Sequence, residues 1–176
     1  KGQIHAHDTD RHRLRPIFER LQRAGARNVQ VIGADEGERL TALAGKLDCV
    51  FIDAPCSGSG AWRRNPDSKW RLTEKQLQQR LADQQAVFDQ GAKLVRPGGR
   101  LVYVTCSVLP EENGDQVASF LEGQGSFAVT PYREQWLAAI GTPAPDSADG
   151  DDNLLLTPAR HGTDGFFVSV MRRANG

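Results

Sequence analysis

Cysteine is scarce in this sequence, and its placement argues against two common classes of small protein. The 176 residues contain three cysteines, Cys49, Cys56 and Cys106, and no two of them form a CxxC pair. An odd number of widely spaced cysteines disfavours a disulfide scaffold and a structural zinc site. Free cysteines are typical of a reducing compartment, so we expect a cytoplasmic protein.

Long apolar runs and an excess of charge are also missing. The sequence shows no signal peptide and no apolar run long enough to cross a bilayer, so we expect no membrane partner. Lys and Arg together number 22, as do Asp and Glu, which gives a formal net charge of zero. Any nucleic-acid site must therefore be local rather than a property of the whole surface.

The sequence does contain an alternation of strand-like and helix-like segments. Strands are predicted at residues 3–8, 29–35, 48–53, 100–107, 127–131, 154–158 and 165–173. Helices are predicted at residues 13–28, from Thr73, where Gln76 completes a capping box, and from Pro110. This order favours an α/β, Rossmann-like sheet that is mostly parallel, with the last two strands as an antiparallel pair.

Two further stretches carry structural expectations. The apolar run Cys49–Ile52 favours a strand that is buried on both faces, with Cys49 packed in the core. Residues 142–153 form the one low-complexity stretch, and we expect a mobile surface loop there.

Acidic residues end the first two predicted strands. Ligands of open α/β sheets bind at the carboxyl ends of the strands, and a carboxylate there can accept two hydrogen bonds from a ribose diol. Asp8 fits that role, although it could instead cap the helix that follows, a task that Thr9 or Asp10 could also perform. Asp35 could contact an adenine amino group, or it could simply form a turn.

Cys56 and Cys106 each stand where a strand gives way to a loop. A buried cysteine usually only packs, but a thiolate is also the most nucleophilic side chain at neutral pH. The two positions are 50 residues apart (106 − 56), which suits a crossover between neighbouring parallel strands. We therefore expect both thiols to face one pocket.

Three stretches resemble the RNA cytosine-5 methyltransferases of the Sun/NOL/NOP group. They are "DAPCSGSGAWRRNPDSKW", "LVRPGGRLVYVTCSVLPEEN" and "DGFF", and the resemblance runs from Asp8 to Phe167. It implies a Rossmann-like, S-adenosylmethionine-dependent methyltransferase sheet. It also implies RNA as the substrate, with ribosomal RNA expected and tRNA left open.

The resemblance assigns roles to matching positions. Cys106, in the Thr-Cys motif, would be the nucleophile that attacks cytosine, and Cys56 would serve product release. Asp53 would hold the cytosine edge and lie beside the cofactor, and Asp8 and Asp35 match the acids that bind it.

The loop after Cys56 mixes cations with aromatic rings. Arg63, Arg64 and Lys69 stand close to Trp70, a combination that suits phosphate contact and base stacking. The alternative is a solvated loop with tryptophan packed beneath it.

One part of the family pattern is absent: the glycine-rich cofactor turn and the first strand before it. We therefore expect residues 1–176 to be part of a catalytic domain that binds S-adenosylmethionine weakly alone. The missing strand would leave sheet edges open to self-association. Other hypotheses are a non-catalytic RNA-binding or structural module, and a methyltransferase for DNA or protein.

Overall fold

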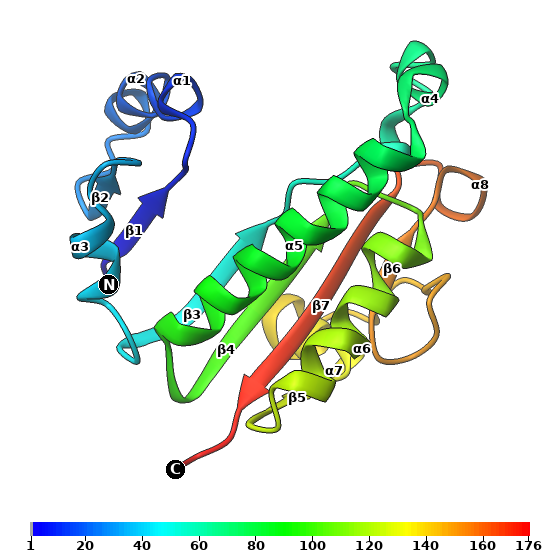
Figure 1. Cartoon of the computed structure of the whole chain (residues 1–176). Helices are drawn as coiled ribbons and strands as arrows, with labels where there is room; N and C mark the ends of the chain where they lie inside the picture. The colour runs from blue at the N-terminus through cyan, green and yellow to red at the C-terminus, as the bar shows by residue number, and fades with distance from the viewer. Residues whose placement is uncertain (1) are drawn as a thin grey trace. The chain divides into compact units, whose positions relative to one another are not determined.

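The computed structural model describes residues 2–176, which form two compact units, with the division in the chain between Ala44 and Gly45 (Figure 1). The first unit contains β1 (Ile4–His7), α1 (Arg11–Leu14), α2 (Ile17–Arg23), β2 (Val29–Ile32) and α3 (Gly37–Thr41). The second unit begins with β3 (Leu47–Asp53), η1 (Ser59–Ala61), α4 (Asp67–Arg71), α5 (Glu74–Leu94), β4 (Val95–Thr105) and η2 (Pro110–Glu112). It continues with α6 (Gly114–Gly123), β5 (Phe127–Val129), α7 (Tyr132–Ile140), β6 (Leu154–Leu156), α8 (Pro158–His161) and β7 (Phe166–Arg173).

The first unit is a small parallel β–α–β arrangement. Strands β1 and β2 pair in parallel, as predicted. The single helix expected at residues 13–28 is wrong, because the structure has two short helices separated at Pro16. Proline has no backbone N–H, so the helical hydrogen-bond ladder is interrupted there. Neither helix contains a buried residue, and Phe18 is 61% exposed.

The second unit holds a mixed five-stranded sheet in the order β3-β4-β7-β5, with β6 also paired to β7. Strands β3 and β4 are parallel, whereas β7 runs antiparallel to β4, β5 and β6. The expected α/β fold with an antiparallel C-terminal strand is therefore confirmed. The expected mostly parallel pairing is not found in this sheet, where β3 and β4 form the one parallel pair among the described strands. Among the described strands, β1, β2, β3, β5 and β6 each pair with one other strand only.

The core of the second unit lies between its sheet and helices α5 and α6, which cross one face of the sheet (Figure 1). Thr73 and Gln76 form the predicted capping box at the start of α5. The Phe88 ring of α5 stacks on Tyr103 of β4 with centroids 4.2 Å apart, and on Phe120 of α6 at 4.6 Å. These rings hold β4 firmly against both helices. No helix within residues 2–176 combines the length and apolar character that a bilayer crossing requires.

The expectation that Cys49 is packed in the core is wrong. Strand β3 is an edge strand, and α5 covers only the face that carries Ile52. Alternate residues of a strand point to opposite faces, so Cys49 and Phe51 face away from α5 and are exposed, Phe51 to 64%. An unbroken apolar run therefore did not mean burial on both faces.

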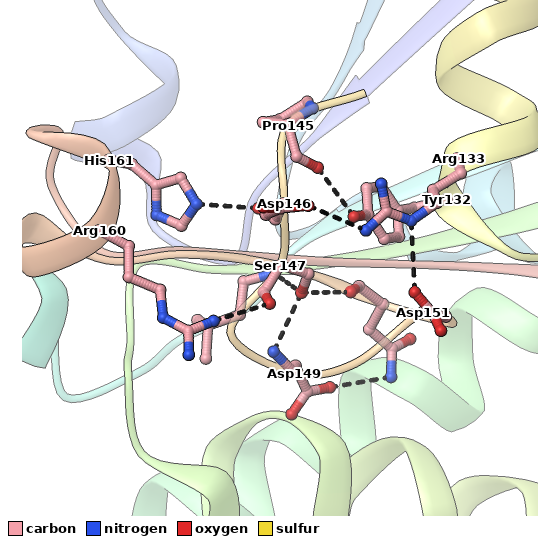
Figure 2. Close-up of polar contacts among 11 residues, drawn as sticks. Tyr132, Arg133, Pro145, Asp146, Ser147, Asp149, Asp151, Arg160 and His161 are labelled. Atoms are coloured by element: carbon pink, nitrogen blue, oxygen red, sulfur yellow. Dashed lines mark hydrogen bonds and ion pairs between the residues drawn. The ribbon is translucent and has the colours of Figure 1, made fainter. Parts of the chain in front are cut away.

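The low-complexity stretch at residues 142–153 is tied down by hydrogen bonds, contrary to the expected mobile loop (Figure 2). Ser147 Oγ donates to the Asn153 carbonyl at 2.7 Å and accepts from the Leu155 N–H at 2.9 Å. The Tyr132 hydroxyl donates to the Pro145 carbonyl at 2.8 Å. Short polar side chains close turns by bonding to nearby backbone groups, and here they tie together residues 145–155.

Candidate active site

The carboxyl ends of β3 and β4 bring the two predicted thiols together. These strands are parallel neighbours, with Asp53 opposite Val104, so the loops that follow them leave the sheet side by side. The Cys56 and Cys106 sulfurs are 3.4 Å apart. Cys106 is exposed and Cys56 is half-buried. The predicted proximity of the two thiols is confirmed, and a pocket that both face stays a prediction.

The loop after Asp53 is held against the end of β4 by its backbone. The Ala54 N–H donates to the Val104 carbonyl at 2.9 Å, and the Gly60 N–H donates to the Cys106 carbonyl at 2.9 Å. Gly58 has a φ of 69°, a left-handed conformation that glycine adopts without a steric penalty. The small residues of "SGSG" therefore allow the backbone to turn tightly beside Cys106.

Gly165, just before β7, contacts this loop at Gly60. Its N–H donates to the Gly60 carbonyl at 2.9 Å. A Cβ atom on Gly165 would lie 2.7 Å from the Gly60 Cα, so the two backbones touch where any side chain would collide. The sequence signal for this contact was the "DGFF" stretch, which gave no indication of its partner.

Buried hydroxyls and an amide order the loop after Cys106. Ser59 Oγ bonds to Ser107 Oγ at 2.8 Å and accepts from the Val108 N–H at 2.9 Å. Thr105 Oγ1 donates to Asn113 Oδ1 at 2.6 Å, and Asn113 Nδ2 donates to the Ser107 carbonyl at 3.0 Å. Because polar groups in such a dry network are paired, the loop has one defined conformation.

Glu112 is a buried carboxylate beside the thiols that sequence reasoning missed. Its side chain is 0% exposed and accepts hydrogen bonds from the Ser57 N–H at 2.7 Å and the Ser57 hydroxyl at 2.5 Å. Gln84, also fully buried, donates to the same carboxylate at 3.2 Å. Nothing in "PEEN" distinguished Glu112 from its exposed neighbour Glu111.

The two thiols have opposite acidities. The hydrogen bond from the Cys56 thiol lowers the pKa of Cys106 to about 7, and this effect outweighs partial burial and the nearby charges of Asp53 and Glu112. The same hydrogen bond, together with burial, raises the pKa of Cys56 well above its ordinary range. These shifts favour Cys106 as the thiolate of the pair and Cys56 as its hydrogen-bond donor, a pattern typical of an activated nucleophile.

The cations predicted to contact RNA already have partners within the chain. Arg64 pairs with Asp164 at 2.6 Å, and Arg63 approaches the same carboxylate at 3.7 Å. Lys69 lies over the Trp70 ring, 5.4 Å from its centroid, and Trp70 is 82% exposed. Trp70 therefore does not pack beneath the loop, because its ring is exposed to solvent.

The two acids predicted to bind cofactor lie in the first unit, just beyond the carboxyl ends of the parallel strands β1 and β2. Asp10, not Asp8, caps α1, because its side chain accepts from the His12 N–H at 2.8 Å. One Asp8 oxygen accepts from the Asp10 N–H at 2.8 Å, which leaves its second oxygen available to a diol. Asp35 forms an exposed ion pair with Arg11 at 2.9 Å.

These features define a class before they define a family. A Rossmann-like α/β sheet with an antiparallel last strand and acids at strand ends is the architecture of S-adenosylmethionine-dependent methyltransferases. The family described as 16S rRNA methyltransferase RsmB/F matches residues 1–172. The chain belongs to this family.

Individual relatives agree with this assignment. Ribosomal RNA small subunit methyltransferase B of Klebsiella pneumoniae (strain 342) is 35% identical over 99% of the chain. The crystal structure of PH0851 matches 98% of the chain with 30% identity and a TM-score of 0.85. NSun6 from Pyrococcus horikoshii, solved with SFG, matches 100% of the chain with 28% identity and a TM-score of 0.80. The chain spans 38% of the length of the Klebsiella relative, and 37% and 42% of the two solved chains.

Proposed function

We propose that this chain carries the cytosine-reactive part of an enzyme that methylates carbon 5 of cytosine in RNA, with Cys106 as the nucleophile. The observation that carries the proposal is the contact of two thiols at 3.4 Å at the ends of adjacent parallel strands. A lone cysteine would fit many reactions, whereas a thiolate with a second thiol against it suits a reaction with separate attack and release steps.

The chemistry explains why two thiols are needed. Carbon 5 of cytosine is a poor nucleophile, and attack of the Cys106 thiolate on carbon 6 forms an S–C bond that makes carbon 5 enamine-like. Bound S-adenosylmethionine supplies an electrophilic methyl group to that carbon. A base then removes the proton from carbon 5, the S–C bond breaks, and the Cys106 thiolate is restored.

Cys56 is the base that this arrangement favours for the release step. Its pKa is raised first by the hydrogen bond to Cys106, which holds its proton in place. Once Cys106 is bonded to carbon 6, it no longer carries the negative charge that accepts this hydrogen bond. Cys56 can then lose its own proton to solvent and, as a thiolate, take the proton from carbon 5.

Asp53 completes the site by holding the cytosine edge. It is the last residue of β3 and is exposed, on the strand end that leads into the Cys56 loop. A carboxyl group that shares a proton with a ring nitrogen stabilises the charge that builds there during attack. Its position beside the cofactor remains part of the same proposal.

The cofactor proposal rests on chemistry in the first unit. Asp8 keeps one carboxylate oxygen for a ribose diol, and Asp35 stands at the end of the neighbouring strand. Both suit S-adenosylmethionine. Weak binding of that cofactor by the 176-residue chain on its own stays a prediction.

RNA is the proposed substrate, with small-subunit ribosomal RNA ahead of tRNA, as the family description supports. The exposed Trp70 ring can stack on an unpaired base, while Lys69, Arg63 and Arg64 contact phosphates. The target cytosine must leave any base stack to reach Cys106. A cytoplasmic location and self-association at a strand edge stay predictions.

The test uses the full-length protein with S-adenosylmethionine and a small-subunit ribosomal RNA fragment that carries cytosine fluorinated at carbon 5. Fluorine cannot leave as a proton does, so the covalent adduct is trapped. We expect the adduct in the unmodified protein and in Cys56→Ala, and none in Cys106→Ala, as measured by denaturing gel and mass spectrometry. Cys49→Ala, which removes an exposed thiol elsewhere on β3, is the matched control.

The opposite result would overturn the proposal. An adduct that persists in Cys106→Ala and disappears in Cys56→Ala would assign the attack to Cys56. The nucleophile would then lie in the Pro-Cys motif, as it does in DNA cytosine methyltransferases. If both variants kept the adduct, the enzyme would use neither thiol as its nucleophile.

A further inference from the structure

Glu112 stands out as the one carboxylate among the fully buried polar side chains of residues 2–176. Burial of a carboxylate is costly unless hydrogen bonds compensate for the lost water. Here the Ser57 N–H and hydroxyl and the Gln84 amide provide that compensation, and all three come from outside the 3-10 helix that carries Glu112. Burial of this carboxylate costs free energy, and the carboxylate contacts the loop that carries Cys56. Packing alone does not explain why it is there.

The donors that bond to Glu112 also involve the residues on either side of Cys56. Ser57 directly follows Cys56 and makes two hydrogen bonds to the carboxylate. Gln84 also donates to the carbonyl of Pro55, the residue just before Cys56, at 2.9 Å. Both chain neighbours of Cys56 are thus held, directly or through Gln84, by one buried carboxylate.

Glu112 is in turn anchored to the strand that carries Cys106. The hydroxyl of Tyr103, a fully buried residue of β4, donates to the Glu112 carbonyl at 2.8 Å. The next residue, Asn113, bonds to Thr105 and to the Ser107 carbonyl on either side of Cys106. The carboxylate therefore connects the Cys56 loop to the end of β4.

We propose that Glu112 is a positioning residue, which keeps the Cys56 thiol against Cys106 by clamping the backbone on both sides of Cys56. The proposal rests on the proposed function for the meaning of the Cys106 thiolate, but the clamp is tested by thiol chemistry that needs neither RNA nor cofactor.

Charge alone predicts the opposite effect, and this makes the clamp testable. The titratable groups that act on Cys106 are Cys56 from the loop, Asp53 from the end of β3 and Glu112 from η2. The negative charge of Glu112 raises the pKa of Cys106, whereas the Cys56 hydrogen bond lowers it and is the larger effect. Removal of the charge alone would therefore lower the pKa of Cys106, whereas loss of the clamp would raise it.

The experiment measures the rate of alkylation of Cys106 by iodoacetamide against pH in the full-length protein, with the labelled peptide identified by mass spectrometry. Only the thiolate reacts, so the midpoint of the profile reports the pKa. In Glu112→Ala we expect the midpoint to rise from about 7 toward the ordinary thiol value of about 8.5. Glu111→Ala, which removes the exposed neighbouring carboxylate, should leave it unchanged.

A second variant keeps the proposal open to failure if Glu112→Ala does not fold. Ser57→Ala removes one donor to the carboxylate and leaves Glu112 in place, so we expect a smaller rise in the same direction. A folded variant with an unchanged or lower midpoint would overturn the clamp. If the midpoint rises in Glu112→Ala while the unmodified protein forms no adduct with fluorinated cytosine, the result supports the clamp and contradicts the proposed function.

Discussion

At the scale of single residues, one hydrogen bond joins the two sulfur atoms. The hydrogen bond between Cys56 and Cys106 lowers the pKa of Cys106 to about 7, below the ordinary value for a thiol. Because a lowered pKa favours the charged form, reactivity rises as the pH passes about 7 and falls away below it. The largest cause of the lowered Cys106 pKa is this hydrogen bond and not a neighbouring cation.

Substitution of Cys56 separates the donor from the bulk of the side chain. Cys56→Ala removes the donor, so we expect the midpoint of the Cys106 alkylation profile to move to higher pH. Cys56→Ser keeps a hydroxyl donor at the same place and should preserve a low midpoint. Equal midpoints in the two variants would show that this hydrogen bond does not control the acidity of Cys106.

The residues themselves were predictable from the sequence to an uneven degree. Cys56 and Cys106 were placed together because each ends a strand in a parallel sheet, a rule that depends on local pattern alone. Glu112 was missed because its burial depends on contacts with Ser57 and Gln84, far from it in the chain. Cys49 was misplaced because sequence pattern does not show which face of an edge strand a helix covers.

At the scale of elements, the contact of Gly60 with Gly165 joins the reactive loop to the start of β7. A side chain at Gly165 would meet Gly60 and Val108, so Gly165→Ala must push two backbone segments apart. We expect a loss of about 1–3 kcal/mol in the free energy of unfolding, measured by denaturant titration.

A matched control lies at the end of α6. A Cβ atom on Gly123 would meet nothing within 4 Å, so Gly123→Ala should leave stability unchanged or raise it slightly. Equal stability of Gly123→Ala and Gly165→Ala would mean that the loop adjusts freely around Gly60.

Most elements followed from hydrophobic period and cap residues. The capping box of α5 and the antiparallel pairing of β6 with β7 were both predicted from short stretches of sequence. The break at Pro16 and the ordered stretch at residues 142–153 were not. In the first case a proline outweighed the apolar spacing, and in the second the composition hid hydrogen bonds that only the fold could supply.

At the scale of the whole chain, the two units differ sharply in their buried cores. The first unit buries only Ile32 and Leu40 among its described apolar residues, whereas the sheet of the second unit contains fully buried residues such as Leu101 and Tyr103. Local stability follows buried apolar contact, so the first unit should open more easily than the second.

Amide hydrogen exchange on the 176-residue chain tests this difference. We expect the amides of β1 and β2 to exchange faster than those of β4 and β7, which are the paired strands of the larger sheet. Equal protection of the two groups would contradict the expectation, and would show that the first unit gains its stability elsewhere.

The place of β7 in the sheet also bears on how the protein is made. Phe166–Arg173 are synthesised after β3, β4 and β5, yet β7 lies between β4 and β5 in the finished sheet. Until that strand emerges, β4 lacks its antiparallel partner and Gly60 has no Gly165 beside it. The loop that carries Cys56 therefore reaches its final contacts only after β7 has been synthesised and has paired with β4.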